Sequence, residues 1–271
     1  MLLVARRLRR PTAGGGRIRN VERRLRGGNL GGALLVDGTV RRTAGVWTAS
    51  VHALLAHLQA RGFNRAPRPL GFDEHGREVL TYLPGATVGD QKPWPAWVHS
   101  DDTLLQVADW LREYHLAVAD FVPPVGSVWR LGGHWAPGQV VCHNDAAPYN
   151  AAWLEGQLSG FFDWDFAAPA LPDWDLAFTA CAWVPLHARH VASAEGFSAF
   201  HDRRRRLELL LDRYGWEGGV DPLLTTVDRR LQAHARDVTR LARNGDPSFQ
   251  KLVDTGAVRD IEVARTELAD L

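Results

Sequence analysis

Four polar residues near the middle of the chain have types and spacing that could support metal-assisted chemistry. The stretch VVCHNDAAPYN, residues 140–150, opens with an apolar run and then places His143, Asp145 and Asn150 close together. Asp163 follows in FFDWDF, beyond two further short apolar runs. An apolar run that ends in such a cluster is typical of a buried strand that carries a functional loop.

The two apolar runs before Asp163 predict a β-hairpin. They cover residues 151–154 and 158–162, and the turn-forming residues EGQ separate them. A hairpin brings its open ends together, so Asn150, just before the first strand, should meet Asp163, just after the second. Asp145 precedes Asn150 by only a few residues and is held close by. Two carboxylates and an amide oxygen are hard ligands that suit Mg²⁺.

This ligand set has a specific use in phosphoryl transfer. That reaction needs positioning, charge neutralisation by Mg²⁺, and a carboxylate that orients and deprotonates the attacking hydroxyl. The catalytic loop of a kinase separates the base Asp from the metal-binding Asn by four residues, as Asp145 and Asn150 are separated here. His143 lies two residues before Asp145. Asp163 follows beyond the hairpin, at the position of the metal-binding Asp of kinases. The alternative interpretation is that these are loop-capping polar residues.

The elements around the site predict two lobes. Residues 27–42 contain a β-hairpin with an Asp37-Gly38 turn, and an amphipathic helix follows, with Thr48 or Ser50 as its N-cap and Gly62 as its stop. Two strand candidates flank DEHG, and from residue 101 the pattern is mainly helical. The sequence therefore predicts an α+β, bilobal fold: a basic flexible leader at 1–26, a small β-rich N-lobe at 27–83, and a larger mainly helical C-lobe at 84–271.

Composition narrows the class of protein. The chain has 271 residues, 45% of them hydrophobic, and two cysteines, Cys142 and Cys181. Two cysteines make no disulfide framework, so a reducing cytoplasm is the expected compartment. Neither a membrane span nor a signal peptide is predicted, because no run of 18 uncharged apolar residues occurs and arginines follow the first residues at once.

The net charge of +1 hides an asymmetry along the chain. Residues 1–30 carry nine Arg against one Glu, but they lack interleaved aromatic residues, so the sequence does not favour nucleic acid as a partner. Residues 151–271 carry 19 acidic against 14 basic residues. That acidic half favours a cationic small-molecule substrate, although an ordinary solvated surface explains the excess equally well.

Three segments of the C-lobe resemble a known family. CHNDAAPYN, FFDWDFA and PDWDLA are similar to the signature of the aminoglycoside phosphotransferase-like family, small-molecule kinases with a protein-kinase-like fold. The resemblance covers roughly residues 27–215. It implies that Asp145 is the catalytic base, that Asn150 and Asp163 bind Mg²⁺, that His143 braces the catalytic loop, and that Asp175 ties this loop through backbone hydrogen bonds.

The resemblance also implies a nucleotide site. REVLTYLPG resembles the strand that leads into a kinase hinge, where the backbone from Thr81 to Leu83 would hold the base of ATP or GTP. Kinases use a strand Lys on the phosphates, paired with a Glu on the next helix. This lobe has no Lys before Lys92, and strand alternation selects Arg42 of TVRR over Arg41 instead. His52 stands where the helix Glu would be expected, and GGNLGGALL is a loose match to a phosphate-covering loop.

Three functional classes follow from these observations. The first is an ATP- or GTP-dependent phosphotransferase that acts on a hydroxyl of a small molecule, with aminoglycosides and other antibiotics among the candidate acceptors. The second is a non-catalytic kinase-like protein of the peptide-toxin immunity type, which the Arg42 and His52 departures would fit. The third is a glycosyltransferase, because DWD occurs twice, but that class needs alternating βα units upstream of the motif.

Overall fold

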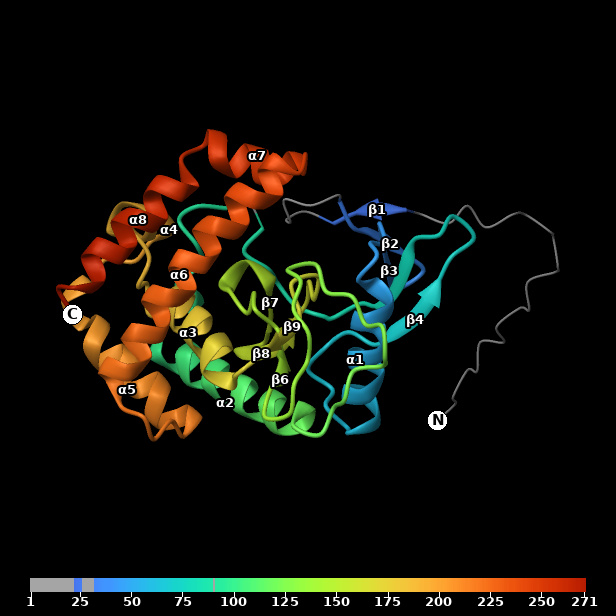
Figure 1. The fold of residues 1–271 in the computed structure, drawn as a ribbon, viewed down its shortest axis with the longest axis horizontal. Helices are drawn as coiled ribbons and strands as arrows, with labels where there is room; N and C mark the ends of the chain where they lie inside the picture. Colours follow the sequence, from blue (N-terminus) through green and yellow to red (C-terminus); the bar gives the residue numbers. More distant parts are fainter. Residues whose placement is uncertain (1–21, 26–31, 90) are drawn as a thin grey trace, which may run out of the picture.

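The computed structural model describes residues 22–25, 32–89 and 91–271 and has two lobes (Figure 1). The smaller lobe is a five-stranded antiparallel sheet in the order β1-β2-β3-β5-β4, with α1 packed beside it. The larger lobe is mainly helical. This confirms the predicted α+β organisation. The elements of the smaller lobe are β1 (Arg23–Arg24), β2 (Leu34–Val36), β3 (Thr39–Arg42), α1 (Thr48–Ala60), β4 (Pro69–Phe72) and β5 (Glu78–Thr81).

The predicted first hairpin is confirmed, and its turn explains why it forms. Strands β2 and β3 pair with Val36 opposite Thr39, and both turn residues have positive φ, 49° at Asp37 and 76° at Gly38. Two residues of positive φ make the turn whose twist matches that of a hairpin, and Asp-Gly adopts it readily. The local sequence thereby fixes the register that later places Arg42.

The central helix of the N-lobe ends where it was predicted to end, but it begins differently. Gly62 follows α1 with φ 76°. The N-cap is Trp47, which makes no side-chain capping bond, so the prediction of Thr48 or Ser50 was wrong. The Thr48 hydroxyl accepts a bond from the Gly45 amide instead, and the Ser50 hydroxyl accepts one from the amide of Val128, in a C-lobe loop. Tertiary contacts have taken both hydroxyls away from capping.

The boundary predicted for the leader was also wrong by a few residues. Arg23 and Arg24 form β1 and pair with Leu35 and Leu34, so this part of the segment belongs to the sheet. Residues 1–21, and residues 26–31 of the Gly-rich stretch, lie outside the described part of the chain.

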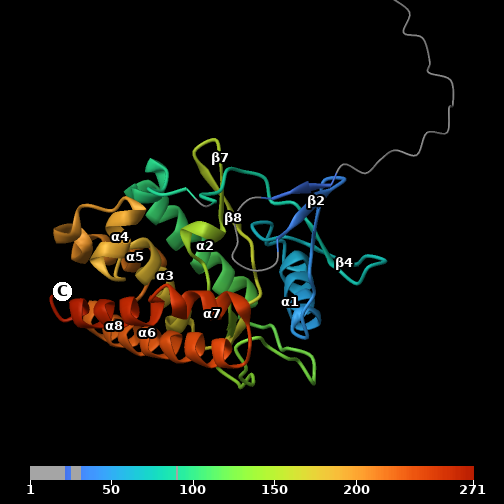
Figure 2. The same ribbon diagram turned by 90° about the horizontal axis from the view of Figure 1, so that it is seen from above.

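The C-lobe is built around α2, which lies beneath two short β-ladders (Figures 1 and 2). β6 pairs with β9, and β7 pairs with β8. The helices α3 to α8 complete the lobe. The elements are η1 (Ala96–His99), α2 (Asp101–Val118), β6 (Val140–Cys142), η2 (Pro148–Asn150), β7 (Ala151–Leu154), β8 (Gln157–Phe161), β9 (Ala168–Ala170), α3 (Pro172–Trp183), α4 (Arg189–Glu195), η3 (Phe200–Asp202), α5 (Arg203–Tyr214), α6 (Val220–Arg243), α7 (Pro247–Asp254) and α8 (Ala257–Leu268).

The fold bears on the glycosyltransferase class and on membrane spans. The glycosyltransferase interpretation required alternating βα units, and the antiparallel sheet that precedes the motif shows that it was wrong. As for membranes, none of the helices within the described residues is both long enough and apolar enough to span one.

The lobes meet where β8 packs against the segment between α1 and β4. The Arg65 carbonyl accepts a bond from the indole N–H of Trp110, 2.9 Å away, and the Arg65 guanidinium donates to the Leu158 carbonyl at 3.2 Å. Gly160 of β8 lies against the same backbone, because a Cβ there would stand 2.0 Å from the Arg65 carbonyl oxygen. Only a glycine allows this approach.

We therefore expect Gly160→Ala to lower the free energy of unfolding by about 3 kcal/mol, through backbone overlap and positive-φ strain. Gly156→Ala is the matched control: this glycine has φ 80° in the turn of the same hairpin, and a Cβ there meets open space. Urea unfolding of the two variants measures the difference. Equal losses would mean that the close approach does not hold the lobes together.

Candidate active site

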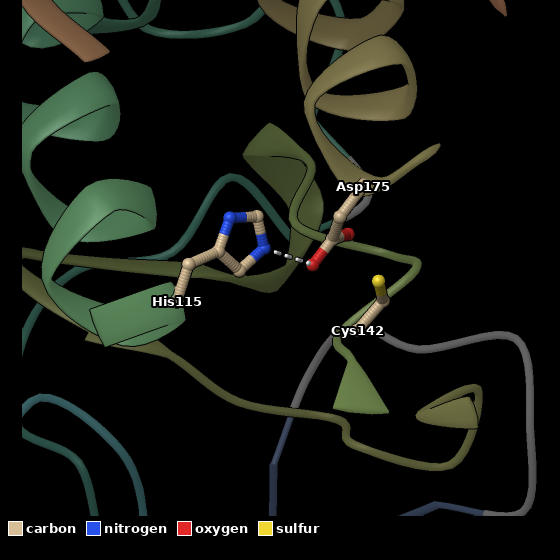
Figure 3. Close-up of side chains that lie close together, drawn as sticks. All are labelled: His115, Cys142 and Asp175. Atoms are coloured by element: carbon tan, nitrogen blue, oxygen red, sulfur yellow. Dashed lines mark hydrogen bonds and ion pairs between the residues drawn. The ribbon is translucent and has the colours of Figure 1, made fainter. Parts of the chain in front are cut away.

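A single carboxylate fixes the start of the predicted catalytic loop. Asp175, in the first turn of α3, is fully buried and accepts the backbone N–H groups of His143 and Asn144, each at 2.8 Å. Its other neighbour is His115, whose Nε2 lies 3.3 Å from the same carboxylate (Figure 3). Burial alone would raise the pKa of Asp175, but these hydrogen bonds outweigh it and lower that pKa. The carboxylate therefore stays ionised and anchors the loop.

His115, Cys142 and Asp175 also form the one cluster of three or more His, Cys, Asp or Glu side chains within the described residues whose ligand atoms lie close enough to share a metal ion, within 4.8 Å of one another. Their contacts give a different explanation. Both carboxylate oxygens of Asp175 accept backbone amides of the loop. His115 Nδ1 lies 2.7 Å from the Tyr214 hydroxyl, and burial raises the pKa of the Cys142 thiol. A protonated thiol beside an occupied carboxylate is a structural core, not a metal site.

His143 braces the loop from below. Its side chain is fully buried, and its ring centroid lies 4.4 Å from that of Trp164. Its Nδ1 accepts the backbone N–H of Asp145 at 3.2 Å. Burial lowers the pKa of His143 to about 4, so the imidazole is neutral near pH 7. A neutral, enclosed ring that holds the next residue's amide is a positioning group.

Asp145 is held by two neighbours in the same loop. The Tyr149 hydroxyl donates to one carboxylate oxygen at 2.7 Å, and the Asn150 amide nitrogen donates to the other at 2.8 Å. Burial, together with the nearby charge of Asp163, raises the pKa of Asp145 to about 8, against the lowering effect of the two hydrogen bonds. A carboxyl group with a pKa near neutrality is suited to exchanging a proton.

The predicted hairpin brings Asn150 and Asp163 together. Ala151 of β7 pairs with Phe161 of β8, and the Phe162 amide donates to the Asn150 carbonyl at 2.9 Å. Asn150 turns its NH₂ group toward Asp145, which leaves its amide oxygen available to a cation. Asp163 is partly buried, which would raise its pKa, but Arg42 lowers that pKa and keeps the carboxylate ionised. An ionised carboxylate and a free amide oxygen fit Mg²⁺.

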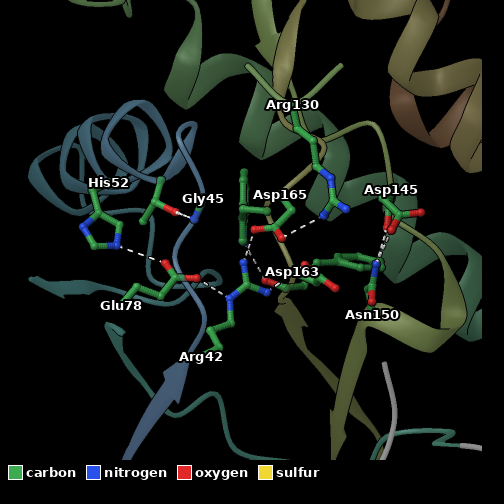
Figure 4. A network of polar contacts seen from close by, with 12 residues as sticks. Arg42, Gly45, His52, Glu78, Arg130, Asp145, Asn150, Asp163 and Asp165 are labelled. Atoms are coloured by element: carbon green, nitrogen blue, oxygen red, sulfur yellow. Dashed lines mark hydrogen bonds and ion pairs between the residues drawn. The ribbon is translucent and has the colours of Figure 1, made fainter. Parts of the chain in front are cut away.

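Arg42 stands at the centre of a carboxylate network that joins the lobes (Figure 4). Its Nη1 donates to Asp163 at 2.8 Å, and the same guanidinium bonds Asp165 and Glu78. Burial would lower the pKa of Arg42, but these carboxylates raise it overall. Arg41, the alternative that alternation disfavoured, points instead toward Asp73. The Arg42 guanidinium thus lies beside Asp163, where a bound metal cation would also contact this carboxylate.

Sequence reasoning missed the partner of Arg42. Glu78 lies directly opposite Arg42 in the β3–β5 register, so the pair is cross-strand rather than strand-to-helix. His52 Nε2 lies 3.1 Å from the second oxygen of Glu78. His52 stands at the helix position that supplies the acidic residue in kinases. Here it contacts an acidic residue of the sheet, Glu78, instead. Burial opposes ionisation of Glu78, but His52 and Arg42 prevail and lower its pKa.

Arg130 was also missed. It lies between α2 and β6 and donates to Asp165 at 3.3 Å (Figure 4). It also donates to Asp246 at 2.8 Å, and its guanidinium lies over the Trp47 ring, 4.6 Å from the centroid. Phe166 and Phe249 lie on its other sides at 5.1 and 5.8 Å. Its segment lacks periodicity and motif, so no signal in the sequence could have marked it.

Two cavities meet at these residues. The interlobe cavity, about 630 Å³, is lined by Arg42, by residues 81–83 of the predicted hinge, and by Tyr149 and Asp163 from the C-lobe. The Thr81 amide is already bonded to the Arg68 carbonyl, so this N–H is not available to a base at the hinge.

The C-lobe cavity, about 470 Å³, is lined by Asp145, Asn150, Asp163 and Tyr149 and by aromatic side chains from other elements. Tyr149 and Asp163 therefore line both cavities. Of the residues that sequence reasoning selected, Asp163 lines both cavities, Arg42, Thr81 and Leu83 line the interlobe cavity, and Asp145 and Asn150 line the C-lobe cavity. His143 and Asp175 line neither cavity and support the catalytic loop from below.

Comparison with known proteins agrees with this geometry. A profile of the phosphotransferase enzyme family matches residues 99–210. The trifolitoxin immunity protein of Rhizobium leguminosarum bv. trifolii is 35% identical over 222 residues, which cover 78% of this chain and 83% of that protein. The chain belongs to the aminoglycoside phosphotransferase-like family.

Solved structures show that the fold is the protein-kinase-like fold of such phosphotransferases. The GDP complex of aminoglycoside 2'-phosphotransferase-IIIa has a TM-score of 0.62 at 15% identity, covering 93% of this chain and 94% of that one. The macrolide 2'-phosphotransferase MphH of Brachybacterium faecium has a TM-score of 0.55 at 17% identity, covering 90% and 91%.

The ion pair between His187 and Glu195 gives a pH-dependent prediction. Glu195 lines the C-lobe cavity. His187 Nε2 lies 2.7 Å from Glu195, and although burial opposes protonation, hydrogen bonds to the Cys181 carbonyl and to Glu195 raise the pKa of His187 to about 10. A raised pKa stabilises the fold fully below the unfolded value of 6.5, and this contribution is lost as the pH rises through 10. The stability gap between wild type and Glu195→Gln should therefore be widest near pH 6.

Urea unfolding at pH 6, 8 and 10 measures that gap. Asp260→Asn is the control, because its partner His190 is largely exposed and such a pair contributes little at any pH. A gap that stays constant from pH 6 to 10 would mean that Glu195 does not hold His187 protonated.

Proposed function

We propose that this protein is a Mg²⁺-dependent phosphotransferase that moves the γ-phosphoryl group of ATP or GTP to a hydroxyl of a small molecule. The observation that carries the proposal is the wall shared by the two cavities. Asp163 lines both, and Asp145 and Asn150 stand beside it on the C-lobe side. A donor in one cavity and an acceptor in the other would meet across three groups that phosphoryl transfer requires.

The nucleotide would lie in the interlobe cavity. The Tyr82–Leu83 backbone would hold its base, and Arg42 would clamp its phosphates, because a guanidinium binds phosphate oxygens bidentately. Arg42 must then exchange part of its contact with Asp163 and Asp165 for contact with phosphate. Glu78, paired with His52, stays behind to orient the guanidinium.

Asn150 and Asp163 would hold the metal. When bound, Mg²⁺ would neutralise the charge of the transferring phosphoryl group and fix its orientation. The acceptor hydroxyl would donate to Asp145. As the hydroxyl oxygen bonds to the γ-phosphorus, its proton passes to Asp145, and the bond from the γ-phosphorus to the bridging oxygen breaks, so that the nucleoside diphosphate departs with that oxygen. Tyr149 and Asn150 keep the Asp145 carboxylate aimed during this exchange.

The relationship to an immunity protein is compatible with this chemistry. The relative is a trifolitoxin immunity protein, a name that indicates protection against a toxin, and phosphorylating a toxin is one way to protect. The rival proposal, a non-catalytic immunity protein, is supported by the contacts of Arg42 with Asp163 and Asp165, which a binding protein would have no need to open. The variants below separate the two.

ATP or GTP with Mg²⁺ should raise the melting temperature of the wild type at millimolar concentration, since ligand binding stabilises the folded state. In Asp163→Asn the loss of a ligand charge should reduce this shift by more than half. The fold should stay intact, but the variant also loses its ion pair with Arg42, so each shift is measured against the melting temperature of the same variant without ligand. Differential scanning fluorimetry with and without EDTA measures both. A shift that is the same in the variant, with the same metal dependence, would remove Asp163 as a ligand.

Asp145→Asn keeps the shape of the side chain but removes the proton acceptor. Turnover should fall by roughly 10²–10⁴, the usual contribution of a general base, while nucleotide affinity stays close to wild type. Asp173→Asn is the control: Asp173 lies on α3, 3.4 Å from the Thr226 hydroxyl, and this change should reduce turnover far less.

An ATP-consumption assay against a panel of hydroxyl-bearing antibiotics and metabolites provides the measurement. Wild-type turnover in Asp145→Asn would contradict the mechanism. If the chain protects cells against a toxin and Asp145→Asn protects equally well, the non-catalytic function is the correct one.

A further inference from the structure

A second, more apolar pocket opens beside the candidate acceptor site. This side pocket, about 230 Å³, lies among α3, α4, α6 and α8, which are neighbours in Figure 1. Apolar side chains supply most of its wall, among them Cys181, Val191, Val227, Leu231, Ile261 and Ala264. Nothing in the proposed phosphoryl transfer uses it.

The side pocket is continuous with the C-lobe cavity. Both are lined by Trp94, Tyr149, Phe178 and Leu252, together with three polar residues. Tyr149 donates its hydroxyl to Asp145 at 2.7 Å, so the shared wall reaches the candidate base itself. A molecule whose hydroxyl is at Asp145 can therefore extend its remaining atoms into the side pocket.

The charges around the two spaces do not suit a polycation. The three carboxylates beyond Asp145 and Asp163 each face a basic side chain already. Glu195 contacts Lys92 and His187, Asp237 contacts Arg240, and Asp260 contacts His190. Arg230 and His234 also line both spaces, and burial lowers the pKa of His234 to about 4, so its ring is neutral.

We propose that the acceptor is an amphipathic alcohol, whose hydroxyl binds at Asp145 and whose apolar arm, of about the size of a phenyl or isobutyl group, fills the side pocket. This rests on the proposed function and names its acceptor class. An apolar cavity of about 150 Å³ holds a benzene molecule in other proteins, so the volume here accommodates one ring or a branched chain. An aminated sugar would leave apolar walls without a partner.

A matched series of neutral alcohols tests the proposal by binding alone. The probes are N-acetylethanolamine, N-acetylleucinol and N-acetylphenylalaninol, which share a hydroxyl and an amide and differ in the apolar arm. Burial of such an arm should tighten binding ten- to hundredfold between the first and the last probe. Titration followed by NMR, in the presence of Mg²⁺ and ADP, measures each Kd, and kanamycin serves as the polycationic comparison.

Two variants fill the side pocket from positions that are only partly buried. Ala182→Phe on α3 and Val191→Phe on α4 should each reduce the advantage of N-acetylphenylalaninol to less than threefold. Leu116→Phe, at an exposed position of α2, is the control and should keep it. Equal Kd values across the series in the wild type, an undiminished gradient in both filled variants, or tighter binding of kanamycin than of any alcohol would each overturn the proposal.

The same samples separate this inference from the proposed function. ATP consumption is measured with each probe in the wild type and in Asp145→Asn. A graded affinity without phosphorylation of any probe supports an apolar binding pocket and contradicts phosphoryl transfer to these alcohols. Phosphorylation without a gradient supports the kinase and contradicts the pocket assignment.

Discussion

The arrangement of the whole site depends on one buried carboxylate. Asp175 accepts the two backbone amides that begin the loop after β6, and it makes these bonds where water cannot compete. Buried amides without partners would destabilise the fold by about 1–3 kcal/mol each. The loop therefore leaves the strand in one direction only, with His143 below it in an aromatic enclosure and Asp145 above. Asp175 therefore ties the start of α3 to the end of β6, two elements that are far apart in the sequence.

Around that anchor the two lobes are held by charge. Arg42 from the sheet contacts carboxylates of both lobes, and Arg130 continues the chain of ion pairs to Asp246 at the start of α7. Since each guanidinium is flanked by at least two acids, neither arginine is left as an unpaired buried charge. Packing complements charge at the other side of the interface, where Gly160 lets β8 touch the backbone of Arg65.

The sequence was most informative where local chemistry determines structure. The turn at Asp37-Gly38 follows from backbone preference, and its register, with strand alternation, selects Arg42 over Arg41. The spacing of Asp145, Asn150 and Asp163 around a hairpin predicted their convergence, because the hairpin is itself a local structure. What could not be predicted depends on contacts between distant segments. Glu78 becomes the partner of Arg42 only once β5 pairs with β3, and Thr48 and Ser50 lose their capping role to tertiary bonds. Arg130 lies in a segment with no periodicity at all.

The Arg42 and Arg130 network has an electrostatic consequence for how a nucleotide can enter. Two guanidinium groups face four carboxylates, those of Glu78, Asp163, Asp165 and Asp246, so this network carries a formal excess of negative charge. If the proposed function is correct, a bare triphosphate would meet this excess where its phosphates approach Asp163, whereas a triphosphate that arrives with its divalent cation carries the compensating charge with it. The network would then favour the ion-paired form of the nucleotide over the free form.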